Sequence, residues 1–343
     1  MRMQATELTE FARSVLAAAN VDSEECSILT DNLIWNDLVG RANHGVERLP
    51  IMVRRVQAGL IRSPAKMTFT QQSDTMALLD ADDGFGQVAG TRATDRAIEL
   101  ARATGVGVVG VHHSNFFGTG AYFIHRAAEA GMIALVLSNS FPKVAAQGGI
   151  HPVLGTNPFA FGAPRGNGKT FMMDMSTAAL AGSTLRTYLS KGLNLPEGLV
   201  VDEHGKPVTD PTQAANGSLL PASGAKGFGL AMMVEILAGV LTGAGMSHQV
   251  GSIYKDFERF GNNGHFILTL DIERWMLRET YFARIEALAD MVGVLDGSND
   301  VRFPGEARWH AMSESRKYGI NVEQATAEKL SKLAIELGTQ SPF

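Results

Sequence analysis

The sequence contains a single cysteine and no long run of apolar residues, and each shortage excludes a class of structure. Cys26 is the only cysteine in 343 residues, so the chain can form neither an intramolecular disulfide nor a multi-cysteine zinc site. No segment approaches the roughly 20 apolar residues that a helix needs to cross a membrane. The first 20 residues follow a helical pattern and lack the apolar core and cleavage site of a signal peptide. We therefore expect a cytoplasmic enzyme.

The chain also lacks a surplus of positive charge. Its 30 Lys and Arg residues and 35 Asp and Glu residues give a formal net charge of −5. We therefore expect no general attraction to nucleic acid or to an anionic membrane. Glycine, in contrast, is abundant: the chain has 37, most of them in the middle of the sequence, where the backbone can approach a ligand closely.

Hydrophobic periodicity indicates helices at both ends of the chain. Residues 5–40 predict two amphipathic helices, and a third can start near His44 if Pro50 lies in its first turn or kinks it. Residues 275–343 are again mostly helical in pattern. Because a mixed pattern separates these ends, we expect an α+β fold with a discontinuous helical domain, residues 1–68 and 300–343, around an α+β domain, residues 69–299.

The middle of the chain alternates between strand and helix patterns. Strands are expected within residues 66–84 and at 106–114, 132–140 and 264–272, the last of which would close the sheet, and helices at 87–105, 120–131 and 225–243. The segments FAFGAPRG (159–166) and KTFMMDMS (169–176) suggest glycine-rich turns, followed by an irregular stretch to residue 224.

One glycine pattern imitates a dinucleotide fingerprint. Gly84, Gly86 and Ala89 have the G-x-G-x-x-A spacing between a strand and a helix. The acidic residue that should follow the next strand and bind ribose hydroxyls is missing, because that strand ends in His112 and His113. We therefore expect a structural turn and not a Rossmann fold. Neighbouring residues of a strand face opposite sides, so the two histidines are poor joint ligands and we expect no metal site.

Three other segments are suited to binding an anion or a nucleotide. Thr119 lies between Gly118 and Gly120 at the start of a predicted helix, where free amides can meet a phosphate, although a simple helix cap is an equal alternative. Lys226 opens an apolar helix among glycines, and close packing of those glycines is the alternative. Asp174 either caps a helix, which its spacing favours, or accepts a hydrogen bond from a ribose hydroxyl.

The stretch RANHGVERLP contains the strongest candidate for acid–base chemistry. His44 and Arg48 are four residues apart and would share a helix face. Histidine titrates near neutrality, as a proton donor to a carbonyl requires, and arginine binds a carboxylate through two parallel hydrogen bonds. From spacing alone, a solvated helix end is an equally good interpretation.

Taken in order, these motifs resemble the malate/L-lactate dehydrogenase family, a non-Rossmann group of NAD(P)-dependent oxidoreductases. The resemblance runs through HGVERLP, DGFGQVAG, SNFFGTGAY, GTNPFAFGAP, DMSTAALA, LPEGLVVDEHGKPVTDP, LLPASGAKGFGLAMMVEILAGVLTG and RFPGE, and so covers nearly the whole chain. It implies a helical substrate domain, an unusual α+β cofactor domain with a mixed, largely antiparallel sheet, and a homodimer.

The resemblance also implies roles for individual residues. His44 would donate and accept the proton, Arg48 would bind the substrate carboxylate, and Asn43 would sit beside them. NAD or NADP, between which the sequence does not discriminate, would contact Phe116, Phe117, Gly118, Thr119, Gly120, Thr156, Asp174, Met175, Ser176, Ala225, Lys226, Arg302 and Gly305.

Three positions depart from the family pattern. Asn43 stands where relatives usually have Ser, Phe116 replaces a histidine, and Thr184 replaces a frequent Asp or Lys. Asn43 and Thr184 can form hydrogen bonds but supply no carboxylate. The expected reaction is hydride transfer between nicotinamide and a small 2-oxo or 2-hydroxy acid. Reduction of a cyclic 2-imino acid and a binding homologue without turnover are the alternatives.

Overall fold

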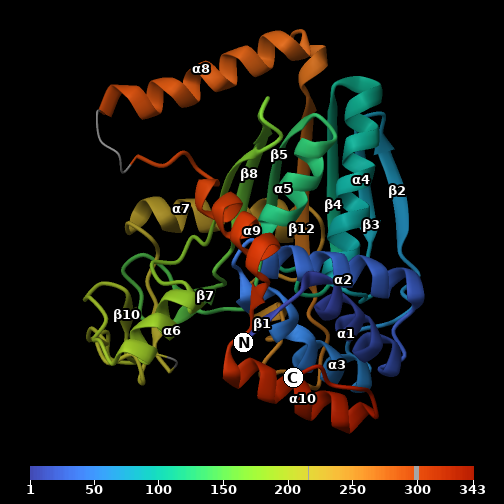
Figure 1. The fold of residues 1–343 in the computed structure, drawn as a ribbon. Coiled ribbons are helices and arrows are strands. Elements are labelled where there is room, and N and C mark those ends of the chain that lie inside the picture. The colour runs from blue at the N-terminus through green and yellow to red at the C-terminus, as the bar shows by residue number, and fades with distance from the viewer. Residues whose placement is uncertain (215, 297–300) are drawn as a thin grey trace.

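A seven-stranded sheet forms the centre of the computed structural model, which describes residues 1–214, 216–296 and 301–343 (Figure 1). In spatial order its strands are β2 (Thr68–Ser73), β3 (Met76–Asp80), β4 (Val106–Ser114), β12 (Asn263–Asp271), β5 (Met132–Ser138), β8 (Phe159–Pro164) and β9 (Thr170–Met175). Within the described ranges β3 and β4 run parallel and the other neighbours are antiparallel. The expected α+β class with a mixed, largely antiparallel sheet is confirmed.

Helices cover both faces of this sheet. On one face lie α4 (Gly86–Thr104) and α5 (Gly120–Glu129), and on the other lies α7 (Ala225–Val234), which continues as a π-helix at Glu235–Val240. Strand β5 serves both layers, because Ala134 and Val136 face α4 and α5 while Leu135 and Leu137 face α7. This alternation makes the middle of the chain a three-layer structure.

The two ends of the chain meet in one helical unit. It contains α1 (Ala5–Ala18), α2 (Ser23–Leu38), α3 (Leu49–Gln57) and α10 (Gln324–Leu337), whose apolar faces share a core. The short strand β1 (Arg2–Met3) pairs with β13 (Ile320–Asn321), which ties the N-terminus to the C-terminal region. In Figure 1 both termini lie beside these helices. Pro50 lies in the first turn of α3, as expected, where its missing amide hydrogen costs no helical hydrogen bond.

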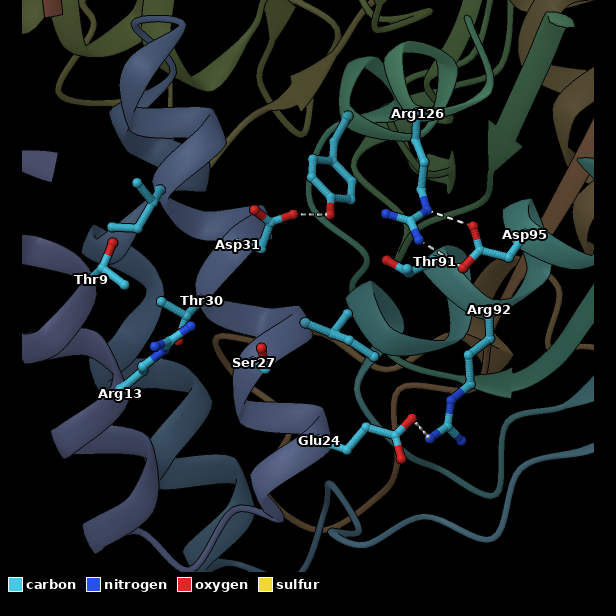
Figure 2. Close-up of a pocket in the computed structure, with 13 residues that line it drawn as sticks. Thr9, Arg13, Glu24, Ser27, Thr30, Asp31, Thr91, Arg92, Asp95 and Arg126 are labelled. Atoms are coloured by element: carbon cyan, nitrogen blue, oxygen red, sulfur yellow. Dashed lines mark hydrogen bonds and ion pairs between the residues drawn. The ribbon is translucent and has the colours of Figure 1, made fainter. Parts of the chain in front are cut away.

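Charged side chains join this helical unit to the helices on the sheet. A cavity of about 440 Å³ lies among α1, α2, α4 and α5 (Figure 2). Three contacts cross or line it: Arg126 with Asp95, Arg92 with Glu24, and the Tyr122 hydroxyl with Asp31. Because most of its charges are satisfied by one another, we assign this cavity a structural role.

The segments 159–166 and 169–176, expected to be turns, are strands β8 and β9. That expectation is wrong because the glycine and small residues of these segments allow a helix to pack closely against the strands and do not form turns. A Cβ atom at Gly162 would lie 2.7 Å from the Cβ of Ile124, so only glycine lets α5 approach the sheet this closely. The stretch to residue 224 is also less irregular than expected, since it contains α6 (Gly182–Lys191) and the strands β10 (Val200–Val201) and β11 (Ser218–Leu219). These two strands join the earlier β6 (Val144–Ala145) and β7 (Pro152–Leu154) in a four-stranded sheet.

Strand β12 and the end of β4 also differ from the sequence expectation. Although β12 is the last strand of the sheet in the sequence, it lies in the middle of it, between β4 and β5. Its register shifts so that His112 and His113 together oppose Gly264, which is a β-bulge. His113 has a φ of 48°, and the two imidazole centroids are 4.3 Å apart. The expectation that these histidines face opposite sides is therefore wrong.

Two further helices complete the fold. Helix α9 (Glu306–Tyr318) packs near α2, and α8 (Arg278–Asp296) extends along one end of the molecule, away from the helical unit (Figure 1). In the part of the chain that the structure describes, no helix is both long and apolar enough to span a membrane.

Candidate active site

A cavity of about 510 Å³ lies where the helical unit meets the sheet. Eleven of the residues expected from the sequence line it: Asn43, His44, Phe116, Phe117, Gly118, Thr119, Gly120, Thr156, Asp174, Met175 and Ser176. Arg48 lies next to it, behind Phe116. Ala225, Lys226, Arg302 and Gly305 are not among its lining residues. The fold thus brings these eleven residues together from four separate stretches of sequence, 43–44, 116–120, 156 and 174–176.

A tight turn positions His44. Residues Ala42–His44 and Val46–Arg48 form two consecutive 3₁₀ turns joined at Gly45. Beneath them lies Asp37, near the end of α2, whose carboxylate accepts a hydrogen bond of 2.9 Å from the Val46 amide. A Cβ at Gly45 would lie 2.0 Å from Asp37 Oδ1, so only glycine fits between the turn and this carboxyl group.

The Asp37 carboxyl is almost completely buried, and it was not singled out from the sequence. Burial raises its pKa to about 8, the nearby negative charge of Glu47 adds to this rise, and the Val46 hydrogen bond opposes it. The signal in the sequence is the polar pair Asn36–Asp37, which interrupts the apolar run before the end of α2. Such a pair on a buried helix face indicates a specific hydrogen-bonding partner.

His44 and Arg48 both contact Phe116. The His44 and Phe116 ring centroids are 5.7 Å apart, and the Arg48 guanidinium carbon lies 5.6 Å from the Phe116 centroid. The guanidinium also lies 5.5 Å from the ring of Tyr254 and donates a 2.6 Å hydrogen bond to the Tyr254 hydroxyl. Its Nε donates to the backbone oxygen of Asn43. Arg48 is therefore held between two aromatic rings, with its orientation set by two hydrogen bonds.

The start of α5 presents backbone amides to the cavity. Gly118 has a φ of 89°, and a Cβ at Gly120 would lie 2.6 Å from the Cβ of Ala160. The hydroxyl of Thr119 donates to Asn36 Oδ1 at 2.6 Å, so it is engaged by α2 and not directed at a ligand. What this loop can offer an anion is therefore the positive end of the α5 dipole.

Asp174 forms a buried ion pair that the sequence did not suggest. Its carboxylate accepts a 2.8 Å hydrogen bond from Arg308 Nη2, and both side chains are 9% exposed. Asp174 belongs to β9, and α6 begins only at Gly182. The expectation that Asp174 caps a helix is therefore wrong.

The far side of this ion pair has an unused donor. Arg308 Nη1 is buried and has no hydrogen-bond partner among the described residues. Burial lowers the pKa of Arg308, and the charge of Asp174 opposes that change. A buried guanidinium donor at the edge of a cavity favours a bound anion or hydroxyl group. The glycines at the start of α5 and this donor together suit a phosphate-bearing nucleotide.

One wall of the cavity rests on a fully buried histidine. His265 on β12 forms hydrogen bonds with the hydroxyls of Ser138 (2.9 Å) and Ser114 (2.8 Å), and its ring stacks on Phe117 at 4.5 Å. Burial lowers the pKa of His265 to about 3, so the ring is neutral at physiological pH. Because Ser138 and Phe117 both line the cavity, His265 fixes the positions of two lining residues.

The remaining residues expected from the sequence lie elsewhere. Ala225 and Lys226 are exposed at the first turn of α7, and Arg302 is exposed in the segment before α9. Gly305 begins α9 with a φ of 101°, and a Cβ there would lie 3.0 Å from Met172. Gly305 thus allows α9 to approach β9 and so helps to place Arg308.

Comparisons with known proteins agree over nearly the whole chain. A sequence model described as malate/L-lactate dehydrogenase matches residues 3–331. The chain is 36% identical to an L-sulfolactate dehydrogenase of Methanothermobacter thermautotrophicus, over 98% of this chain and 97% of the relative. It is 35% identical to a malate dehydrogenase of Pyrococcus abyssi, over 99% and 96%. The solved structure of sulfolactate dehydrogenase from Methanocaldococcus jannaschii has a TM-score of 0.91 at 30% identity, covering 99% of this chain and 98% of that one.

Replacing Asp37 by Asn should change how stability depends on pH. The folded protein keeps a proton on Asp37 up to about pH 8, whereas the unfolded chain releases it near the usual aspartate pKa of about 3.9. Wild type should therefore lose stability relative to Asp37→Asn as the pH rises from 5 to 8. Urea unfolding at three pH values measures this difference. Asp74→Asn, at an exposed aspartate, is the control, and its free energy of unfolding should change with pH as that of wild type does. If the difference in unfolding free energy between Asp37→Asn and wild type stayed constant with pH, the raised pKa assigned to Asp37 would be contradicted.

Replacing His265 by Phe should destabilise the protein by about 2–4 kcal/mol, because it leaves two buried hydroxyls without their ring partner at about 1–3 kcal/mol each. Since the folded-state pKa of His265 lies below its unfolded value, its stabilisation is present above about pH 6.5 and lost as the pH falls toward 3. Denaturant unfolding between pH 4 and 7 measures both effects.

A second substitution distinguishes lost hydrogen bonds from altered packing around His265. Adding Ser114→Ala to the His265→Phe variant removes one hydroxyl that has lost its imidazole partner, and it should restore part of the stability. The matched control is His204→Phe, at an exposed histidine. If His265→Phe were as stable as wild type at pH 7, the stabilising role given to this hydrogen-bond network would be wrong.

Proposed function

The chain belongs to the malate/L-lactate dehydrogenase family, and on that premise we propose that it transfers hydride at C2 of a small 2-oxo or 2-hydroxy acid through His44 and Arg48. The enzyme class is that of NAD(P)-dependent oxidoreductases acting on CH–OH groups. The observation that supports the residue assignment most is the placement of one imidazole and one guanidinium against the same Phe116 ring.

Arg48 is suited to bind the substrate carboxylate. Its planar guanidinium stays charged, and the aromatic rings on either side restrict its motion. Among the described residues, its Nε donates to Asn43 and its Nη1 to Tyr254, which leaves further N–H groups of the guanidinium for a ligand. The Tyr254 hydroxyl accepts from Arg48 and keeps its own proton to donate. A carboxylate lying beside Phe116 would thus meet donors from two side chains.

His44 is suited to hold the proton that the substrate oxygen gains or loses. It lines the cavity, and the Asp37–Val46 contact fixes the turn that carries it. When bound, the nicotinamide cofactor supplies or accepts the hydride. His44 would then protonate the oxygen in reduction or accept the proton in oxidation, which typically contributes about 10²–10⁴-fold to the rate. Phe116 would exclude water from the space between the two groups.

The cavity also has the features that a dinucleotide requires. The glycines of the α5 loop, Thr156, Asp174 and Ser176 line it, and Arg308 adds the unused buried donor. The Asp174 carboxylate accepts from Arg308 on one side and can accept a ribose hydroxyl with its remaining lone pairs. We propose that NAD or NADP binds along this wall with its nicotinamide toward His44.

We further propose a cytoplasmic homodimer. Exposed apolar side chains follow the end of α7 and the π-helix: Ile236 is 48% exposed, Val240 54% and Leu241 66%. Trp275 and Leu277, before α8, are about three-quarters exposed. Exposed apolar groups of this size favour burial by a second copy.

Replacing His44 by Ala should lower kcat by about 10²–10⁴-fold with the fold intact, since only the proton carrier is lost. Replacing Arg48 by Lys should lower kcat/KM by about 10–100-fold, mainly through KM, because lysine cannot bind a carboxylate through two parallel bonds. Arg54→Lys, on the exposed side of α3, is the matched control and should leave both constants unchanged.

The same assay should use a panel of 2-oxo, 2-hydroxy and cyclic 2-imino acids, each with NAD(H) and NADP(H). Turnover of His44→Ala within threefold of wild type would exclude His44 as the proton carrier. Faster turnover of imino acids than of oxo acids would reassign the substrate class. Cofactor binding without turnover of any acid would indicate a binding protein.

Replacing Leu241 by Glu should weaken the proposed dimer, because it would bury an unpaired charge in the interface. Light scattering coupled to size-exclusion chromatography should show a dimer for wild type and a concentration-dependent shift toward monomer for the variant. Ile335→Glu, at an apolar position of α10 that is 77% exposed, is the control and should remain dimeric. A monomeric wild type would overturn the proposed assembly.

A further inference from the structure

A second group of chemically active side chains lies outside the cavity, at the ends of β3 and β4. Asp80 is the last residue of β3, and His112 and His113 lie near the end of β4. One potential ligand atom from each lies within 4.8 Å of the other two. None of the three lines the candidate active site. Their proximity has no explanation in the proposed reaction.

The β-bulge is what brings the two histidines to one side. Along a regular strand their side chains would point in opposite directions. Here both residues oppose the single residue Gly264, and His113 adopts a φ of 48° that re-aims its imidazole. A Cβ at Gly264 would lie 1.6 Å from the backbone oxygen of Ala238, so the position opposite the bulge accepts only glycine.

Asp80 already lies at a ligand-like distance from one imidazole. Its Oδ1 is 3.1 Å from His113 Nδ1. Two ligands bound about 2.1 Å from one tetrahedral ion lie about 3.4 Å apart. Asp80 pairs in register with His112 across the parallel strands, which fixes the third ligand beside them.

The chemistry of the three groups suits a divalent metal ion of intermediate hardness. Two imidazoles and one carboxylate form a donor set that zinc, copper and nickel accept, and three protein ligands leave positions for water.

The neighbouring charges favour a cation on balance. Asp82 and Asp83 follow Asp80 in the same turn, and Arg62 is the cation that contacts them. Two additional carboxylates against one guanidinium leave a net negative environment around the three ligands.

We propose that Asp80, His112 and His113 form a binding site for a divalent transition-metal ion, of which Zn²⁺ is the representative. The site would clamp β3 to the bulged end of β4. That strand continues through Asn115, whose side chain donates to the backbone oxygens of Asp83 and Gly84, into Phe116. The ion would thus brace the segment that carries Phe116 without touching the cavity.

Calorimetric titration of the untagged full chain with Zn²⁺ tests this site directly. Wild type should bind one ion per chain, and His112→Ala and His113→Ala should each weaken binding at least tenfold. Asp80→Asn, which keeps the shape of the side chain, should weaken it as well. The control is His204→Ala, at a more exposed histidine outside the group, which should bind within twofold of wild type.

Copper(II) adds a readout that depends on the ligands themselves. Electron paramagnetic resonance of the one-to-one complex should show coupling to two imidazole nitrogens in wild type and to one in His113→Ala. Circular dichroism should confirm that each variant is folded. The proposal would be overturned if His113→Ala bound Zn²⁺ as tightly as wild type. It would also be overturned if wild type bound Zn²⁺ no more tightly than a His112→Ala/His113→Ala double variant. These outcomes do not depend on turnover and leave the proposed reaction unaffected.

Discussion

The contact between the buried carboxyl group of Asp37 and the turn at Gly45 is the constraint on which the site depends. Asp37 belongs to the helical unit, while the turn carries His44 toward the cavity. The carboxyl accepts the Val46 amide and occupies the space that any side chain at residue 45 would need. Because the group is buried, its proton and its hydrogen bond are both part of the folded structure. The backbone turn that carries the proposed catalytic histidine is thus held in place by this contact.

Two other contacts hold residues on the side of the cavity where we propose that the cofactor binds. Asn36 of α2 accepts from Thr119 at the start of α5, and Arg308 of α9 binds Asp174 of β9. In each case a helix from one end of the chain reaches the sheet at the cavity wall. Each contact is a buried hydrogen bond, so a shift of α2 or of α9 would break a hydrogen bond at the cavity wall. The ends of the chain therefore belong to the active site as much as its middle does.

Errors in the sequence interpretation share a physical cause. The glycines of 159–166 indicated turns, but Gly162 is a strand residue that lets α5 pack closely. The spacing around Asp174 favoured a helix cap, yet its partner is Arg308, 134 residues away. His112 and His113 were separated by strand alternation, which the bulge interrupts. Local rules fail at these positions because a distant segment supplies the contact that determines the conformation.

By itself, the sequence determined many of the periodic helices and strands, the family resemblance and half of the residues that line the cavity, because apolar spacing and ordered motifs are local properties. It also paired His44 with Arg48 through their spacing of four. Only the tertiary structure placed Phe116 and Tyr254 around Arg48, joined Arg308 to Asp174 and buried His265 between two serines. These contacts join residues far apart in the chain, and they are strong because the residues are buried. Burial arises only when the helices from the two ends of the chain pack against the sheet, so it is not visible in any single stretch of sequence.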